Sequence, residues 1–561
     1  MSTAPKGAVR SVRARSARSR FDANLAAFRR VYSRFDADAR ARTMERLQAM
    51  RGLALPANTK LPIYYECLLF LRAYPANANM LRLAVSELRR VSTRLRTDTR
   101  RHPALVEQLG MPYVSAVRRY SHDCVRRLME HPHCTVTFEE FFDSTRSLND
   151  VLRLTLPTLE RSTTDLDCSS SELFDALGVP PTRRLRFVIA ELSRLDAAPF
   201  IKDELYNALG VLVRVTPTSA RFSTAFNELT GPAPFFHHER LSVFDSRVLM
   251  NSTLPAARSF SSDERAHTVR IIRDTMTLTG RETDPATYLD ARSLRVFDLE
   301  RGTSIAVYGM HHERQLALES YVGFTAFKNG MPVSYGGAWV FGERADFGMN
   351  IFEPYRGGES GYLMCQLLRV YRQLFRVRYF EVDAHQFGLD NPEGIATGAF
   401  WFYYRYGFRP TSATLRSLAR REKARLVALP GARSTRTTLL ALAESSVALN
   451  FGGPVPITLS SVTSRVTRMI RREYGSDRVA AERDCMARFL ASTHHTMPRD
   501  ADQRAALAEL AILARALGVI DAGSTRLLWA MVSAKPTDVY CYQELLLEFL
   551  RLPAPGLTAS A

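Results

Sequence analysis

Apolar side chains recur at three- and four-residue intervals in much of the first 250 residues, which is the period of an amphipathic helix. The clearest face lies in 79–95 and collects Leu81, Val85, Leu88, Val91 and Leu95. Pro75 separates this predicted helix from the apolar stretch Ile63–Tyr74. Further helices are expected at Leu185–Leu195 and Ile201–Leu212. Residues 26–254 are therefore expected to be mostly helical.

A different pattern begins near residue 255. A predicted helix at Asp263–Leu278 is followed by five short apolar runs that read as strands: Leu294–Asp298, Ser304–Tyr308, Glu319–Lys328, Val333–Phe341 and Asp346–Phe352. Asn329-Gly330 lies between two of them and predicts a hairpin turn, because both residue types tolerate positive φ. The segment 255–412 is thus expected to form an α+β domain built on a mixed sheet.

The sequence outside these two regions predicts a tail and a helical end. Residues 1–25 are expected to form a flexible basic tail. After residue 412, a basic segment and a possible strand at Arg436–Leu442 lead to predicted helices over 460–552. The expected fold is a mixed sheet with flanking helices, placed between two mostly helical regions.

The net charge of +19 is concentrated in two stretches. Residues 1–21 carry six cations and no acid, and residues 409–436 carry eight cations against Glu422 alone. The rest of the chain is close to neutral, so a basic groove for nucleic acid along the whole protein is not required. Nucleic acid stays a possible partner through these two stretches.

The cysteines and the hydropathy pattern predict a cytoplasmic protein. Seven cysteines are scattered without C-x-x-C spacing, which favours reduced thiols. No apolar run approaches the ~18 residues that a membrane span requires. His122, Cys124, His131, His133 and Cys134 lie close together, but their spacing matches no zinc site, so no metal is expected.

The most informative segment runs from Phe352 to Pro410. It reads FEPYRGGESGYLMCQLLRVYRQLF, then RYFEVDAHQFG, then GAFWFYYRYGFRP. Glycines beside an arginine at a helix start allow backbone N–H groups to converge on an anion such as pyrophosphate. The order of strand, glycine loop, helix, strand and aromatic helix resembles the acyl-CoA-binding half of the GNAT N-acyltransferase superfamily. The resemblance covers about 150 residues.

This resemblance implies a site for acetyl-CoA or another acyl-CoA. The strand before the loop would offer backbone amides to pantetheine at Ile351 and Phe352. The family's R-G-x-G-x-G/A loop would be formed here by Arg356, Gly357, Gly358, Glu359, Ser360 and Gly361. Glu359 replaces a usual glycine, and a carboxylate ~5 Å from pyrophosphate costs about 3 kcal/mol at an effective dielectric of 20. We therefore expect the Glu359 side chain to point to solvent while its N–H faces the phosphate.

The resemblance also implies catalytic residues. Tyr403 lies four residues before Gly407, where the family carries a tyrosine that protonates the leaving thiolate. The family's asparagine seven residues before this tyrosine is Ala396 here. A base must accept the proton of the amine, and Asp346, Glu353 and His385 are candidates, with Asp346 and His385 preferred.

The resemblance implies transfer of an acyl group, with acetyl preferred, to an unidentified amine, which is a small molecule or a protein. Two alternatives stay open from the sequence. One is a catalytically degenerate GNAT-fold protein that serves as a binding or scaffold module, which Glu359 and the missing asparagine favour. The other is a nucleic-acid-associated protein that uses the basic tail and residues 409–436.

Overall fold

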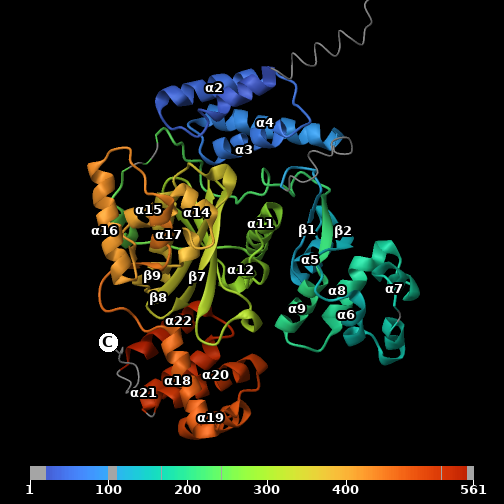
Figure 1. The fold of residues 1–561 in the computed structure, drawn as a ribbon, viewed down its shortest axis with the longest axis vertical. Helices are drawn as coiled ribbons and strands as arrows, with labels where there is room; N and C mark the ends of the chain where they lie inside the picture. The colour runs from blue at the N-terminus through green and yellow to red at the C-terminus, as the bar shows by residue number, and fades with distance from the viewer. Residues whose placement is uncertain are drawn as a thin grey trace, which may run out of the picture.

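The computed structural model describes residues 20–98, 110–165, 167–239, 241, 243–519 and 521–552. Within them the chain is a mixed α and β protein with two open sheets (Figure 1). The larger sheet has eight strands in the order β10-β11-β9-β8-β7-β6-β5-β4. Its strands are β4 (Arg295–Leu299), β5 (Thr303–Tyr308), β6 (Ser320–Lys328), β7 (Met331–Phe341), β8 (Arg344–Ile351), β9 (Tyr379–Val382), β10 (Arg409–Pro410) and β11 (Val447–Asn450).

The five strands predicted between residues 294 and 352 are confirmed as β4 to β8, which form an antiparallel meander. The hairpin turn between β6 and β7 is also confirmed, since Asn329 and Gly330 have φ of 48° and 79°. The predicted preceding helix is α11 (Ser262–Thr279), which starts with a capping box between Ser261 and Glu264. Alternating side chains and turn residues are therefore sufficient to predict this half of the sheet.

Strands β8 and β9 are parallel and diverge along their length. They pair only from Arg344 to Asp346 of β8, although β8 continues to Ile351. Helix α13 (Ser360–Phe375) makes the crossover between the two strands. On its other edge β8 stays paired with β7 as far as Ile351. One edge of the last five residues of β8 is thus left without a neighbouring strand.

The predicted boundary of this domain at residue 412 is wrong. Strand β11 inserts between β9 and β10, so the sheet extends to Asn450. The strand predicted at Arg436–Leu442 is helix α17, because the Thr435 side chain caps its first turn by accepting from the Thr438 N–H. Helices α14 (Pro392–Thr397) and α15 (Ala399–Arg405) lie between β9 and β10 in the chain, and α16 (Ala413–Ala428) follows β10.

The N-terminal helices share one core with the large sheet. They are α2 (Ala37–Arg51), α3 (Lys60–Ala73) and α4 (Ala78–Asp98), and they lie across one end of the sheet (Figure 1). The prediction at 79–95 is confirmed as α4. Residues 20–29 are helical, and Phe21 and Leu25 are buried in the same core. The predicted tail therefore ends by residue 19, and residues 1–19 lie outside the described residues.

A second unit within the region expected to be mostly helical contains a three-stranded antiparallel sheet with its own core. The predicted helix at 201–212 ends instead at Leu209, because Gly210 adopts φ of 61° and the chain continues as a strand. The predicted helix at 185–195 is α8. The elements are β1 (Ala116–Arg118), α5 (His122–Met129), β2 (Cys134–Phe141), α6 (Leu148–Thr155), α7 (Ser170–Ala176), α8 (Arg184–Arg194), α9 (Pro199–Leu209) and β3 (Val211–Pro217).

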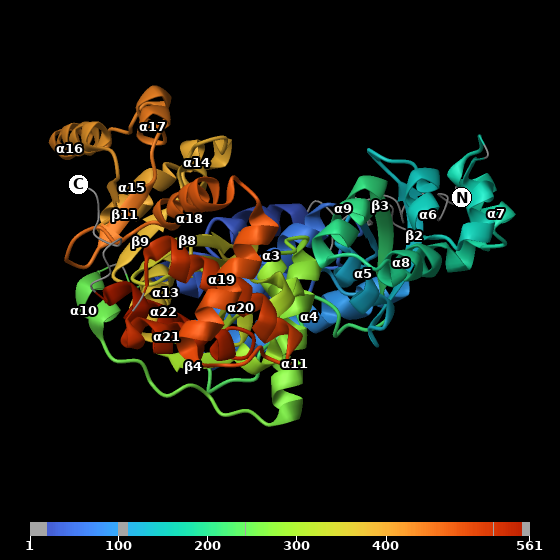
Figure 2. The ribbon, with the colours of Figure 1, turned by 90° about the horizontal axis from the view of Figure 1, so that it is seen from below.

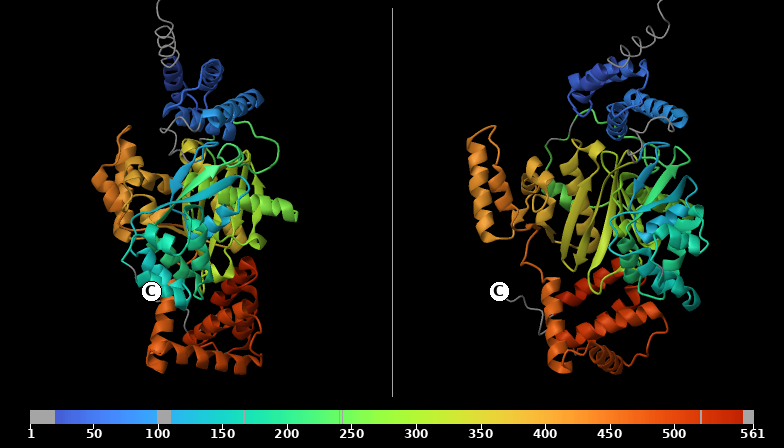
Figure 3. Two further views of the ribbon diagram at one scale, coloured as in Figure 1. Left: turned by 90° about the vertical axis from the view of Figure 1, so that its right-hand side faces the viewer. Right: turned by 45° about the vertical axis from the view of Figure 1, so that its right-hand side comes forward.

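The C-terminal helices form a third core at the opposite end of the sheet from α2–α4, as the two views of Figure 3 show. This confirms the helical prediction for 460–552. The helices are α18 (Leu459–Tyr474), α19 (Arg478–Thr493), α20 (Ala501–Leu517), α21 (Ala522–Ala534) and α22 (Val539–Arg551). Two short helices connect the three-stranded unit to the large sheet: α10 (Ser246–Asn251) before α11, and α12 (Asp284–Thr287) after it.

Candidate functional site

A cavity of about 390 Å³ lies at the end of β8, where β8 has left β9. Ile351 and Phe352 line it from the strand, and Tyr335 lines it from β7. Helix α3 closes another side with Tyr65 and Glu66. The sheet core and the N-terminal helices therefore build this cavity together.

The free edge of β8 faces away from β7. The Phe352 N–H donates to the Val333 carbonyl oxygen of β7 at 3.1 Å, so this amide is not free. Because N–H groups alternate between the two edges of a strand, those of Met349 and Ile351 point to the edge that β9 leaves. The prediction that the Phe352 amide is open to a ligand is wrong, whereas Ile351 lies on the open edge.

The glycine loop that follows is tightly enclosed. Gly357 adopts φ of 93°, and Arg356 beside it is about half-exposed at the cavity. The Arg356 guanidinium forms an ion pair with Glu393. Gly358 packs against the Tyr74 ring and Gly361 against the Tyr406 hydroxyl, so a side chain at either position would collide with them. Tyr74 thus covers the loop, and Tyr406 covers the first turn of α13.

Glu359 does not point to solvent, and that expectation is wrong. Its side chain is fully buried, and its Oε2 lies 2.8 Å from the Lys328 Nζ, which is also fully buried. The Arg301 Nε donates to the Glu359 Oε1 at 3.0 Å. His237 Nδ1 lies 3.6 Å from the same oxygen, beyond hydrogen-bond distance. The Glu359 carboxylate of the loop is therefore held between two cations, Lys328 and Arg301, and the His237 imidazole.

Burial and neighbouring charges shift the pKa values of Lys328, His237 and Glu359 in this cluster. Burial lowers the pKa of Lys328 to about 8, against the attraction of Glu359. Burial also lowers the pKa of His237 to about 4. The pKa of Glu359 lies well below its usual range; burial opposes this shift, and His237, Lys328 and Arg301 outweigh the burial. At neutral pH the cluster holds two cations, one anion and a neutral imidazole, so it carries a net positive charge.

Three carboxylates line the cavity, and one of them, Glu393 of α14, is paired with Arg356. Glu66 lines it from α3, and Glu353 lines it from the short turn Glu353–Tyr355 that follows β8. Burial raises the pKa of Glu66, and the nearby charge of Glu353 raises it further. A carboxylate with a raised pKa is a better proton acceptor than an ordinary one. Glu66 is therefore the strongest candidate base in the cavity.

Tyr403 lies in the aromatic core rather than in the cavity. Its side chain is 4% exposed, and its ring packs edge-on against Phe387 and Phe408. Burial raises the pKa of its hydroxyl above the usual value. The geometry thus gives Tyr403 a packing role and corrects its assignment as the acid that protonates a thiolate.

The two preferred bases also lie outside the cavity lining. Asp346 sits near the start of β8 and pairs with Arg344 at 3.1 Å. Ile351 lies five positions further along the strand, which is ~16 Å at 3.3 Å per residue. His385 follows β9 at the correct end of the sheet, but its Nδ1 faces the Leu389 carbonyl oxygen at 2.9 Å. Asp346 is therefore too distant to act as the base for this cavity.

Of the predicted site residues, the structure brings Ile351, Phe352 and Arg356 to the cavity, with Glu353 beside them. The sequence reasoning missed Tyr65, Glu66 and Tyr335. A usable signal existed for Glu66, since it is the one acid in the apolar stretch Ile63–Tyr74. A buried acid in such a run needs a functional or structural reason.

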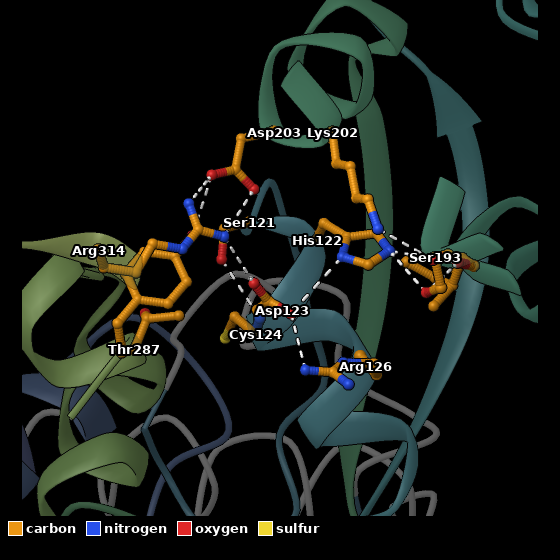
Figure 4. Close-up of polar contacts among 12 residues, drawn as sticks. Ser121, His122, Asp123, Cys124, Arg126, Ser193, Lys202, Asp203, Thr287 and Arg314 are labelled. Atoms are coloured by element: carbon orange, nitrogen blue, oxygen red, sulfur yellow. Dashed lines mark hydrogen bonds and ion pairs between the residues drawn. The ribbon is translucent and has the colours of Figure 1, made fainter. Parts of the chain in front are cut away.

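A second polar cluster joins the three-stranded unit to the large sheet (Figure 4). Arg314 is buried and reaches both Asp203 of α9 and Asp123 of α5, the latter at 3.1 Å. The tetrapeptide HHER occurs at 237–240 and again at 311–314. His237 of the first copy lies beside Glu359, whereas Arg314 of the second lies in this bridge, so the two side chains have different settings. This cluster acts as a bridge between units.

The Ser193 Oγ lies 3.3 Å from the His122 Nε2, and Asp123 lies beside this histidine (Figure 4). This order of hydroxyl, imidazole and carboxylate is that of an activated nucleophile. However, the Ser193 hydroxyl donates to the Ile189 carbonyl oxygen at 2.7 Å, and His122 Nε2 lies 3.2 Å from that same oxygen. Both groups are thus engaged with helix α8.

No group of three or more metal-ligating side chains occurs among the described residues. The His122–Cys134 segment therefore forms no such group, and all seven cysteines are unpaired. Across the described part of the chain, no helix combines the length and apolarity needed to cross a membrane.

A scan of protein-family models, a search of curated proteins and a search of solved structures each found no match to this chain. The geometry of the cavity, the open strand edge and the loop is therefore what indicates a function.

Proposed function

We propose that the protein is an acyl-CoA-dependent N-acyltransferase with a GNAT-like fold, acting on an amine acceptor. The observation that carries the proposal is the unpaired edge of β8 at Met349 and Ile351, which ends in a cavity that three carboxylates line. The order of meander, loop, helix and strand around this edge agrees with the family resemblance. An open strand edge can bind an extended pantetheine chain through backbone hydrogen bonds.

In this proposal the acceptor amine attacks the thioester carbonyl carbon directly. The protonated amine first gives one proton to Glu66, and the neutral amine then forms the new C–N bond. The second amine proton passes to the sulfur as the C–S bond breaks, so that CoA leaves as the thiol. Backbone N–H groups on the open edge of β8 stabilise the negative charge that develops on the carbonyl oxygen. Glu353, next to Glu66, adds negative potential that attracts a protonated amine to the cavity.

The ion pairs of Glu359 with Lys328 and Arg301 make a phosphate site at the loop compatible with the negative charge of Glu359. Glu359 alone would repel pyrophosphate, but Lys328 and Arg301 more than compensate its charge. The first turn of α13 then presents N–H groups and the positive end of a helix dipole. Arg356 at the mouth of the cavity would bind a phosphate in place of Glu393.

One observation favours the degenerate binding protein instead. Tyr74 and Tyr406 pack against the loop, so an anion reaches the helix N-terminus only if Tyr406 turns away. Incubation with acetyl-CoA and a mixture of amines, with free thiol as the readout, tests the two functions. The transferase predicts amine-dependent thiol release that Glu66→Gln reduces. Acyl-CoA binding without amine-dependent thiol release, at any amine in the mixture, would favour the binding protein.

A further inference from the structure

The segment from Arg405 to Arg436 forms a strongly basic flank on the molecule. It contains nine cations and a single acid, Glu422. Eight of the cations are exposed, and these define the basic flank: Arg405, Arg409, Arg416, Arg420, Arg421, Lys423, Arg433 and Arg436. Glu422 is 8% exposed and pairs with Arg425, the ninth cation. Among the described residues, the flank thus has a large unbalanced positive charge at its surface.

The flank stands clear of the rest of the molecule. Helices α16 and α17 project from the edge of the large sheet, as Figures 2 and 3 show. The inner face of α16 is held by buried Leu415, Ala419 and Glu422, which recur at helical spacing. Its cations therefore face outward. Such a projecting surface can meet an extended flat partner without collision from the other units.

Apolar side chains accompany the cations on this projection. Val427 at the end of α16 is 65% exposed, Leu429 is 54% exposed, and Leu440 of α17 is 44% exposed. Val427 lies four residues after Lys423, so it continues the outward cationic face of α16. Nucleic acid would be held by the cations but would leave these apolar groups in water. A lipid surface interacts with both kinds of side chain, because cations bind anionic headgroups and apolar side chains enter the boundary between the headgroups and the acyl chains.

We propose that the basic flank docks the protein on the surface of a membrane that contains anionic phospholipid. Each cation near such a surface strengthens binding by roughly fivefold. The exposed apolar residues add a contribution that salt does not screen. The docking is peripheral and is independent of the proposed acyltransfer.

Co-sedimentation of the full-length protein with vesicles tests this inference. One vesicle set is phosphatidylcholine alone, and the other is phosphatidylcholine and phosphatidylglycerol in equal parts. We expect binding to the anionic set only, weakening by at least about 100-fold in R420E/R421E/K423E. V427S/L429S should weaken binding roughly tenfold, and this loss should persist at high salt.

The control is R468E/R471E/R483E, which changes the net charge equally at exposed cations of α18 and α19. Circular dichroism of each variant verifies that the fold is kept. Equal binding to both vesicle sets, equal loss in the two triple variants, or no binding to either set would overturn the proposal. So would flank-dependent binding to duplex DNA or RNA by a protein that ignores the vesicles.

Discussion

The Lys328 ammonium and the Glu359 carboxylate lie 2.8 Å apart, and neither side chain is exposed to solvent. Lys328 ends β6 at the hairpin turn, and Glu359 precedes α13 in the glycine loop. The pair therefore fastens the loop to the sheet. Removal of one partner of a buried pair leaves an uncompensated charge, which typically costs 3–5 kcal/mol.

The first prediction concerns this pair. Glu359→Gln should lower the free energy of unfolding by about 3–5 kcal/mol, because Lys328 and Arg301 then face each other without an anion. The double variant Lys328→Met/Glu359→Gln should lose less than the sum of the two single variants. Denaturant unfolding measures both. Glu544→Gln, in the exposed pair with Arg376, is the control and should cost at most ~1 kcal/mol. Additive losses in the double variant would show that the pair is not coupled.

The second prediction concerns pH. Between about pH 4 and 6.5 the unfolded chain binds a proton at His237 that the folded chain excludes, because burial lowers the pKa of His237 to about 4. The free energy of unfolding should therefore fall as the pH is lowered through this window, by up to ~3 kcal/mol. His237→Gln should flatten this slope, measured by unfolding from pH 5 to 7. The exposed neighbour His238, changed to Gln, should leave the slope as it is. An unchanged slope in His237→Gln would contradict the assignment.

In this region, features that depend on residues close together in the sequence are predictable, and features that depend on distant residues are not. The strands β4–β8 and the turn at Asn329-Gly330 are predictable, because alternation and turn chemistry act between neighbouring residues. The orientation of Glu359 is not predictable, since Lys328 and Arg301 lie 31 and 58 residues away. The cavity is not predictable for the same reason, because Glu66 of α3 lies 285 residues before Ile351, which lines the same cavity.

Short strands outside the family-like segment were harder to predict. The alternating run Val211–Pro217 is a clear strand pattern, yet it follows a helix without a polar break. Gly210 was the available stop signal. Tyr403 shows the opposite error. Its position in the aromatic helix resembles that of the family's catalytic tyrosine, but its burial depends on Phe387 and Phe408, which that position does not reveal.

The third prediction separates the candidate bases. Glu66→Gln should lower the turnover number for amine acylation by about 100-fold or more, because general base catalysis contributes at least that much. Asp346→Asn should leave turnover within about twofold, since Asp346 lies at the other end of β8. The raised pKa of Glu66 also predicts that turnover increases with pH through a midpoint above its ordinary value. Equal effects of the two substitutions would remove Glu66 from the mechanism.

The fourth prediction concerns Tyr403. Tyr403→Phe should keep turnover close to that of the unchanged protein, because the ring fills the core and Tyr403 is not among the residues that line the cavity. Tyr403→Ala should destabilise the fold by ~3–5 kcal/mol through the cavity that it leaves. Thermal unfolding and steady-state assays of both variants measure these effects. A large loss of turnover in Tyr403→Phe, with acyl-CoA affinity unchanged, would restore Tyr403 as the acid.

We propose that the open edge of β8 and the loop beside it bind acyl-CoA. Unfolding measured in the presence of acetyl-CoA tests this binding most directly. At ~100 times the dissociation constant, acetyl-CoA should raise the free energy of unfolding by about 2.7 kcal/mol. Arg356→Ala should reduce this gain, whereas Arg376→Ala, at an exposed arginine after α13, should retain it. The account predicts this stabilisation with at least one acyl-CoA. No stabilisation by any acyl-CoA at millimolar concentration would contradict it.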